Sequence, residues 1–231
     1  MRGTFIILAS LCVCGAAMAD GFATWNYVPY VAPVTDFAYD IGLYESEAHC
    51  VIDFQVNVDP GDKWTAASAY AYLLRESPDL EAAFWDHPSG GNIPVPATFV
   101  YFGLAAYDSF WTCTEEYPNP DLNPSSVATT FAPGSPIQNT DSLREAEWYA
   151  DPGDPEADGG LYTLARYNVT GDLPFYPLQP DSIWLVISGD LYFSSTGGTP
   201  HPFSLTIPAR IPEPTSLSLL LIGAAAALRR R

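Results

Sequence analysis

Residues 49–58, HCVIDFQVNV, alternate between apolar and polar side chains in the way that a half-buried β-strand does. Because successive side chains of a strand point to opposite sides of the sheet, one face of this segment would be apolar. That face would carry Cys50, Ile52, Phe54 and Val56. Similar runs recur along the chain between clusters of Pro, Gly and Asp, and no long segment has a helical period. The pattern predicts an all-β protein.

Applied to the rest of the chain, the alternation of apolar and polar residues predicts nine short strands, this stretch included, in a single antiparallel β-sandwich. We expect them at residues 34–44, 49–58, 66–74, 98–104, 109–115, 144–149, 161–169, 183–193 and 202–207. One short helix is expected over residues 80–85, because Ser77-Pro78-Asp79 supplies a capping residue, a Pro for the first turn and an acid. Residues 117–138 are rich in Pro, Asn, Ser and Thr and predict a long surface loop.

The first 19 residues are typical of a secretory signal peptide. A single arginine is followed by a short apolar run, and Ala17-Met18-Ala19 forms a small-x-small cleavage pattern before Asp20. The run is too short to be interpreted first as a membrane-spanning helix. We therefore predict three parts: a signal peptide at 1–19, a β-sandwich domain at 20–210 and a distinct C-terminal segment at 211–231.

The C-terminal segment combines Pro212-Glu213-Pro214 with an apolar run over residues 216–228 and a terminal cluster of Arg229, Arg230 and Arg231. The two prolines keep the chain before the run extended. A helix of about 13 residues covers only about 20 Å, which is short for a permanent span. The arginines would stay in the cytoplasm. These features predict a transient insertion in the inner membrane through the C-terminal tail.

The order of triplet, short apolar helix and Arg cluster resembles the PEP-CTERM sorting signal. That resemblance implies processing near the triplet by an exosortase, a membrane-embedded enzyme of Gram-negative bacteria that make extracellular polysaccharide. The resemblance assigns the sorting signal to Pro212, Glu213, Pro214 and the terminal arginines. The alternative interpretation is a plain membrane anchor. The body resembles exported cohesin-like β-sandwich proteins in residues 61–67, 107–110, 146–149 and 159–166. A cohesin-like or jelly-roll-like sandwich is therefore expected.

The chain is strongly acidic, with nine Lys and Arg against 27 Asp and Glu and a formal net charge of −18. Four of the nine basic residues lie in the two terminal segments, so the part between them is relatively more acidic. An acidic surface repels nucleic acid and anionic lipid and favours cations. We expect no nucleic-acid partner.

Two cysteines, Cys50 and Cys113, lie between the terminal segments. Exported proteins sit in an oxidising compartment, where a pair of cysteines usually bridges. Both lie in strand-like segments with their side chains expected on the core face. We predict a Cys50–Cys113 disulfide, with two buried free thiols as the alternative.

Asp154, Glu156 and Asp158 crowd into one Gly-containing loop. Calcium prefers several oxygen ligands on a flexible turn, so a weak calcium site is one interpretation and a solvated acidic hairpin is the other. The loop is not an EF-hand, because Ala165 stands where the bidentate acid should be. No other cofactor is expected.

The sequence contains no HExxH, CxxC or GxSxG motif, and its three histidines have no zinc-like spacing. We therefore expect no catalytic residues and no enzyme activity. The leading hypothesis is an exported structural or adhesive protein of the cell surface or the extracellular polysaccharide matrix. The alternatives are a carbohydrate-binding protein, in which some of the six tryptophans would be exposed, and a secreted hydrolase with convergent acids.

Overall fold

The structure is a computed structural model, and it describes residues 22–28, 49–87, 107–114, 129–131, 138–150, 157–175 and 179–211. Ten strands and one 3₁₀ turn, η2, make up these segments. They are β1 (Ala23–Val28), β2 (His49–Arg75), β3 (Ala82–Phe84), β4 (Phe110–Thr114), β5 (Thr129–Phe131), β6 (Gln138–Asn139), β7 (Leu143–Ala150), β8 (Ala157–Gly171), β9 (Ile183–Phe193), η2 (Ser194–Thr196) and β10 (His201–Pro208). All the strand pairings are antiparallel, so the predicted all-β class is confirmed.

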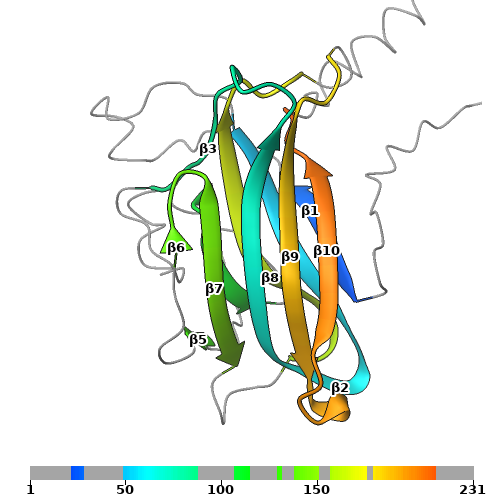
Figure 1. Cartoon of the computed structure of the whole chain (residues 1–231). Helices are drawn as coiled ribbons and strands as arrows, with labels where there is room; N and C mark the ends of the chain where they lie inside the picture. Colours follow the sequence, from blue (N-terminus) through cyan, green and yellow to red (C-terminus); the bar gives the residue numbers. More distant parts are fainter. Residues whose placement is uncertain are drawn as a thin grey trace, which may run out of the picture.

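The strands form two layers that face each other (Figure 1). The layer nearer the viewer, here the front layer, has the order β10-β9-β2-β7-β5, and β6 also pairs with β7. The other layer, the back layer, contains β1, β2 and β8, and β3 and β4 pair with the far edge of β8. Strand β2 belongs to both layers, which makes it the central element of the fold.

The two halves of β2 are joined by a corner at residues 59–63. Before the corner the strand pairs with β1 up to Val56 and with β8 up to Val58, and β8 pairs with it again at Lys63 and Trp64. From Trp64 onward it pairs with β9 and, from Ala66, with β7. Gly61 has a positive φ of 86°, which L side chains rarely adopt. The Asp62 carboxylate accepts hydrogen bonds from the backbone of Lys63 and from both serines at the start of η2. These bonds lower the pKa of Asp62 to about 2 and tie the corner to the end of β9.

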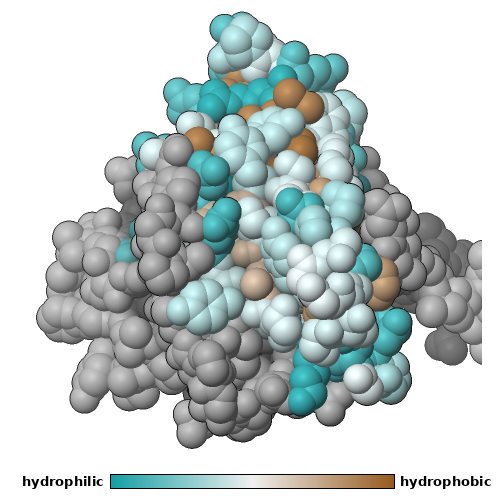
Figure 2. All heavy atoms as spheres, turned by 60° about the horizontal axis from the view of Figure 1, so that its bottom comes forward, coloured by the Kyte–Doolittle hydropathy of each residue, from teal (hydrophilic) through white to brown (hydrophobic). Residues whose placement is uncertain are grey.

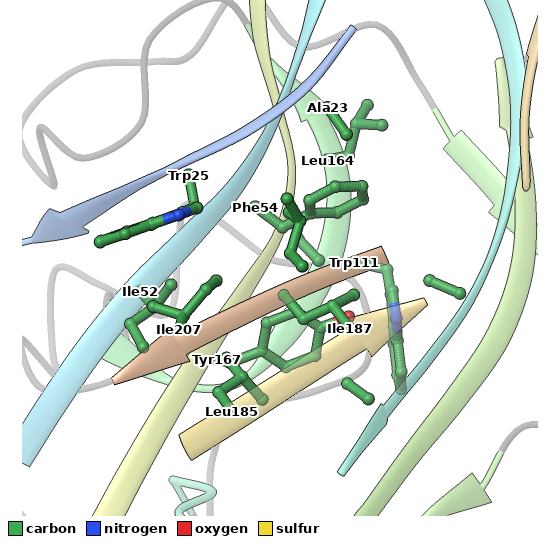
Figure 3. Close-up of a cluster of buried hydrophobic side chains, with 14 of the residues drawn as sticks. Ala23, Trp25, Ile52, Phe54, Trp111, Leu164, Tyr167, Leu185, Ile187 and Ile207 are labelled. Carbon is green, nitrogen blue, oxygen red and sulfur yellow. The ribbon is translucent and has the colours of Figure 1, made fainter. Parts of the chain in front are cut away.

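The hydrophobic core lies between the layers. Along the middle of its second half, β2 turns the small side chains Ala67, Ala69 and Ala71 inward, all at most 2% exposed, while the larger Trp64 and Leu73 at the two ends of this run also pack into the core. Larger residues from the other strands fill the space that the alanines leave, which is the large-against-small pattern of a well-packed core. Phe54 of the back layer stacks on Phe203 of β10 with ring centroids 4.9 Å apart. Figure 3 shows side chains of both layers gathered in one cluster, including Ile52, Tyr167, Leu185 and Ile187.

Several predicted elements match the structure closely. The predicted strand 183–193 has the same bounds as β9, and 109–115, 144–149, 161–169 and 202–207 match β4, β7, β8 and β10 within a few residues. The segments 49–58 and 66–74 are one continuous strand. The loop prediction for 117–138 is wrong in part, because β5 and the first residue of β6 fall inside it. The predicted strands 34–44 and 98–104 lie outside the described residues.

The helix predicted over residues 80–85 is wrong. The capping signals make a single turn, in which the Leu80 amide donates to Ser77 O and the Asp79 amide to Ser77 Oγ. The chain then enters β3, whose residues pair with Gly171, Thr170 and Val169 of β8. Ala82 and Phe84 are buried and Ala83 is half-buried, a period of two. Cross-strand pairing over apolar side chains prevails because the segment is too short to stabilise a helix.

Strands β9 and β2 approach each other closely at Gly189, and a substitution there tests this contact. A Cβ at this position would lie 1.9 Å from the Ser68 carbonyl oxygen, a backbone atom that cannot move without breaking the ladder. We predict that Gly189→Ala lowers the free energy of unfolding by at least about 2 kcal/mol, because such clashes cost more than most surface changes.

The matched control is Ser188→Ala, one residue away and half-buried on the outward face, which should change stability by at most about 0.5 kcal/mol. Urea unfolding of the two variants measures the difference. Equal midpoints for Gly189→Ala and the wild type would contradict the register of β9 on β2.

Candidate functional site

A bidentate ion pair is buried on the outward face of the back layer. Arg166 Nε donates to Asp53 Oδ1 at 2.7 Å and Nη2 donates to Oδ2 at 2.8 Å. The two side chains are 0% and 1% exposed, and the guanidinium carbon lies 5.6 Å from the centre of the Phe110 ring. Burial raises the pKa of Asp53 and the Arg166 guanidinium lowers it. Removal of either partner would leave a buried charge, a change that costs about 3–5 kcal/mol, so the pair anchors β2 to β8.

Asn168 is the centre of a second buried polar group beside this ion pair. Its Oδ1 lies 3.0 Å from His49 Nδ1, and its Nδ2 donates to the Tyr107 carbonyl at 2.9 Å. The Asn168 amide donates to Ser109 Oγ, which in turn donates to the Trp85 carbonyl. The residues before β4 are held against β8 by these bonds. The Ser109 hydroxyl is fully used by backbone groups.

Two carboxyl groups meet near the end of β3, where neither was expected from the sequence. Asp86 pairs with Arg144 through Nη2 and Oδ2 at 2.8 Å, and its carboxyl is also hydrogen-bonded to that of Asp108. Arg144 points into the core from β7, with its side chain 1% exposed and its guanidinium carbon 5.0 Å from the centre of the Phe84 ring. The Asp86 side chain is 40% exposed, so the group reaches the surface at one point.

The Asp108 carboxyl differs from Asp86 in its surroundings. Asp108 is 3% exposed, and its Oδ1 accepts hydrogen bonds from the amides of His87 at 2.8 Å and Ser109 at 2.9 Å. Burial raises the pKa of Asp108 to about 8, and the negative charge of Asp86 contributes to the rise. At neutral pH Asp108 therefore keeps its proton and can donate it to the Asp86 carboxylate.

This acid pair does not have the geometry of a glycosidase. Inverting and retaining enzymes need carboxyl groups separated by about 5–9.5 Å so that a sugar bond or a water fits between them. Here the two groups share a hydrogen bond, and Asp108 is held by two backbone amides. The chemistry that the cluster supports is proton sharing within a buried structural contact.

The three histidines lie in different places. His49 contacts Asn168, and the amide of His87 binds Asp108. His201 forms a cluster with the rings of Phe22 and Phe193, each 5.4 Å away from it and 5.2 Å from each other, beside an apolar groove of about 250 Å³. Within the described ranges no group of three His, Cys, Asp or Glu side chains could hold a metal ion.

A different surface is open to solvent: the outward side of the front layer. We call it the front outer face and define it by residues of three adjacent strands. These are Ser68, Tyr70, Tyr72 and Leu74 of β2, Trp184, Ser188 and Asp190 of β9, and Glu145 and Glu147 of β7; Val186, on the same side of β9, is buried. Tyr70 is 41% and Leu74 49% exposed, and the rings of Tyr70 and Tyr72 lie 5.6 Å apart. Seen from the lower end, the described surface is mostly teal to white, with brown in small separate areas (Figure 2).

The predicted disulfide between Cys50 and Cys113 is wrong in this structure, in which Cys50 is a free, buried thiol. Cys50 pairs with Val169 on one edge of β8, whereas β4 pairs with Ala165 and Thr163 on the other edge. Positions 50 and 113 are thus about 10 Å apart across the sheet alone. A disulfide requires Cα atoms within about 7 Å. Strand periodicity placed the side chain of Cys50 correctly in the core but could not order the strands.

Most of the other predicted site residues cannot be compared with the structure. Asp154, Glu156, the cleavage residues Ala17 and Ala19, and the sorting residues Pro212, Glu213, Pro214, Arg229, Arg230 and Arg231 lie outside the described residues. The backbone of Asp158 pairs with Lys63. No helix in the described segments is long and apolar enough to cross a membrane.

The tryptophans are mainly core residues. Trp25, Trp64, Trp111 and Trp148 are at most 8% exposed, and Trp85 and Trp184 are half-buried. The exposed aromatic area of the front outer face comes from tyrosines, which no motif in the sequence marks. The signal in the sequence is that Tyr70, Tyr72 and Leu74 occupy every second position and alternate with small or apolar residues that face the core.

The described residues define an antiparallel β protein with a buried polar group in its back layer and an exposed aromatic face on its front layer. Comparison with protein families and with curated proteins finds no match to this chain. Its function is therefore argued from its own residues.

The proton on Asp108 predicts a pH dependence of stability. An unfolded Asp loses its proton near pH 4, whereas folded Asp108 keeps it to about pH 8. Its contribution is thus fully present below pH 4 and is lost as the pH rises toward 8, by up to about 1.4 kcal/mol per pH unit. Asp108→Asn keeps the acceptor oxygen and cannot ionise, so it should flatten the fall in melting temperature between pH 4.5 and 8.

The control for this experiment is Asp79→Asn, an exposed acid on the turn before β3, which should leave the slope unchanged. An unaltered slope in Asp108→Asn would show that another group causes the dependence.

Cys50 supplies a separate test. Burial raises the pKa of its thiol to about 12, so almost no thiolate forms at pH 8. We expect iodoacetamide to leave Cys50 unmodified in the folded protein and to modify it in denaturant without any reductant. If modification requires a reductant, Cys50 is disulfide-bonded and the register of β4 is different.

Proposed function

We propose that this chain is an exported, non-enzymatic structural or adhesive protein of the cell surface or extracellular polysaccharide matrix of a Gram-negative bacterium. The observation that carries the proposal is the pairing of a signal peptide ending at Ala19 with a C-terminal Pro212-Glu213-Pro214 triplet, apolar run and Arg cluster. In this proposal the tail holds the chain in the inner membrane until an exosortase-type enzyme processes it.

We infer that the two layers form one β-sandwich of the cohesin-like or jelly-roll-like kind, spanning residues 20–210. Supporting observations are the opposed layers, the shared strand β2 and the cross-layer stack of Phe54 on Phe203. A sandwich whose buried polar groups are hydrogen-bonded to one another is rigid. A rigid domain suits a structural role, because its surfaces keep a fixed shape.

Carbohydrate binding is the second candidate, and one observation favours it: the exposed tyrosines of the front outer face. A secreted hydrolase has less support. The acids that meet, Asp86 and Asp108, interact with each other, and Asp86 is already paired with Arg144.

The processing part of the proposal is tested by intact mass of the protein isolated from its native cells. We expect a mature chain that starts at Asp20 and ends near the triplet, since small residues at Ala17 and Ala19 fit the cleavage site. A stable product that retains Arg229 to Arg231 would mean that the tail is a plain anchor.

The location is tested by fractionation of the same cells. The account expects the mature chain in the cell-surface or matrix fraction, and a variant with Glu213→Ala and Pro214→Ala trapped in the inner membrane. A mature chain found in the periplasm or cytoplasm would contradict the surface role, whatever the chain binds.

A further inference from the structure

The front outer face has an apolar row along β2. Tyr70, Tyr72 and Leu74 follow each other at every second residue, with the tyrosine rings 5.6 Å apart and inclined by 55°. In the register of β2 on β9, Leu74 lies opposite Trp184 and Tyr72 lies opposite Val186. The row therefore continues sideways onto a second strand. An exposed aromatic row on a sheet is more than the scattered apolar residues of an ordinary surface.

Carboxylates gather at the Tyr70 end of this row. Glu145 lies opposite Tyr70 on β7, and Ser68 lies between Glu147 on β7 and Asp190 on β9. Tyrosine and serine hydroxyls alternate with the carboxylates, so hydrogen-bonding groups stand next to aromatic rings.

The basic residues lie elsewhere. Lys63 is at the corner of β2, Arg75 donates to the Leu80 carbonyl, and Arg210 is paired with Asp181. Arg144 and Arg166 are buried on other faces, and the chain's remaining four arginines are in its terminal segments. The front outer face is thus anionic, without a basic side chain of its own.

Charge restricts what this face can bind. Nucleic acids and acidic polysaccharides would be repelled. A second copy in a two-fold contact would bring the same acids together, since such a contact pairs a surface with itself. A partner with positive charge and flat apolar surfaces is complementary, because ammonium groups are attracted both to carboxylates and to the faces of Tyr and Trp.

We propose that the front outer face binds a polysaccharide that carries protonated amino sugars. The apolar faces of the sugar rings would lie on Tyr70, Tyr72 and Trp184, and the ammonium groups would pair with Glu145 and Asp190. The proposal deepens the matrix role and rests on it for the presence of polysaccharide around the cell. A basic protein would also meet the charge, and its lysines could contact the rings. The aromatic row favours sugar rings because their flat apolar faces can cover it, and competition by polylysine separates the two partners.

The test is retention of the purified full-length chain on chitosan beads, compared with chitin and alginate beads. Tyr70→Ser with Tyr72→Ser removes the aromatic row. Its matched control is Phe175→Ser, which changes a residue that is 51% exposed outside the face. Glu145→Gln with Asp190→Asn removes two charges, and Glu76→Gln with Asp79→Asn removes two exposed acids elsewhere. Circular dichroism confirms that each variant is folded.

We expect binding to chitosan, weaker binding to chitin and none to alginate. Each double variant on the face should weaken chitosan binding at least tenfold, and the two controls should bind like the wild type. Failure of the wild type to bind chitosan, or unchanged binding by the tyrosine variant, overturns the proposal.

Two further results would also overturn it. Equal losses in both acid variants would mean that only net charge attracts the polymer. Competition by polylysine equal to that of soluble chitosan at matched charge would identify a basic polypeptide as the partner class. None of these results bears on the location of the chain, which fractionation measures separately.

Discussion

Strand β2 has to pass from one layer to the other within the five residues 59–63, and the other strands are arranged around this passage. Its first half holds β1 and β8, and its second half holds β7 and β9. The corner is fixed by the positive φ of Gly61 and by the Asp62 carboxylate, which binds the two serines after β9. Because Ala67, Ala69 and Ala71 face inward along the middle of the second half, the large side chains of the other strands can fill the core there. The same half turns Tyr70 and Tyr72 outward, so one strand both builds the core and presents the exposed face.

The polar groups of the molecule divide into two kinds with different consequences. Those of the back layer are buried and paired, Asp53 with Arg166 and Asn168 with His49, and buried Asp108 lies beside Asp86, whose carboxyl reaches the surface. Such pairs stabilise one arrangement of the chain, because a partner left alone would be an unsatisfied buried group. Those of the front outer face are accessible and of one sign. Binding is therefore expected on the front, and the back contributes rigidity.

Sequence periodicity predicted most of the strands, and β9 to the residue, because every second residue from Ile183 to Phe193, apart from Gly189, has a large apolar side chain. Local signals failed where distant contacts decide the outcome. The cap at Ser77 predicts a helix, yet pairing with β8 makes Ala82–Phe84 a strand. Pro60 and Gly61 indicated a break between the expected strands 49–58 and 66–74. A corner inside one continuous strand has the same composition as a turn between two strands. Asp86, Asp108 and Arg144 come from three segments, so no spacing in the sequence could have grouped them. The prediction of a Cys50–Cys113 disulfide was wrong for the same reason, because the order of the strands depends on the whole topology.

The central claim is that this β protein works at the cell surface through its front outer face. Hydroxyl-radical footprinting on intact cells measures this directly, by comparing the labelling of Tyr70, Tyr72 and Trp184 in the native matrix with their labelling in the released protein. Phe175, exposed outside the face, serves as the internal reference. The account predicts that the three residues are protected in the matrix and labelled after release, while Phe175 changes little. Equal labelling of the three residues in both states would contradict it.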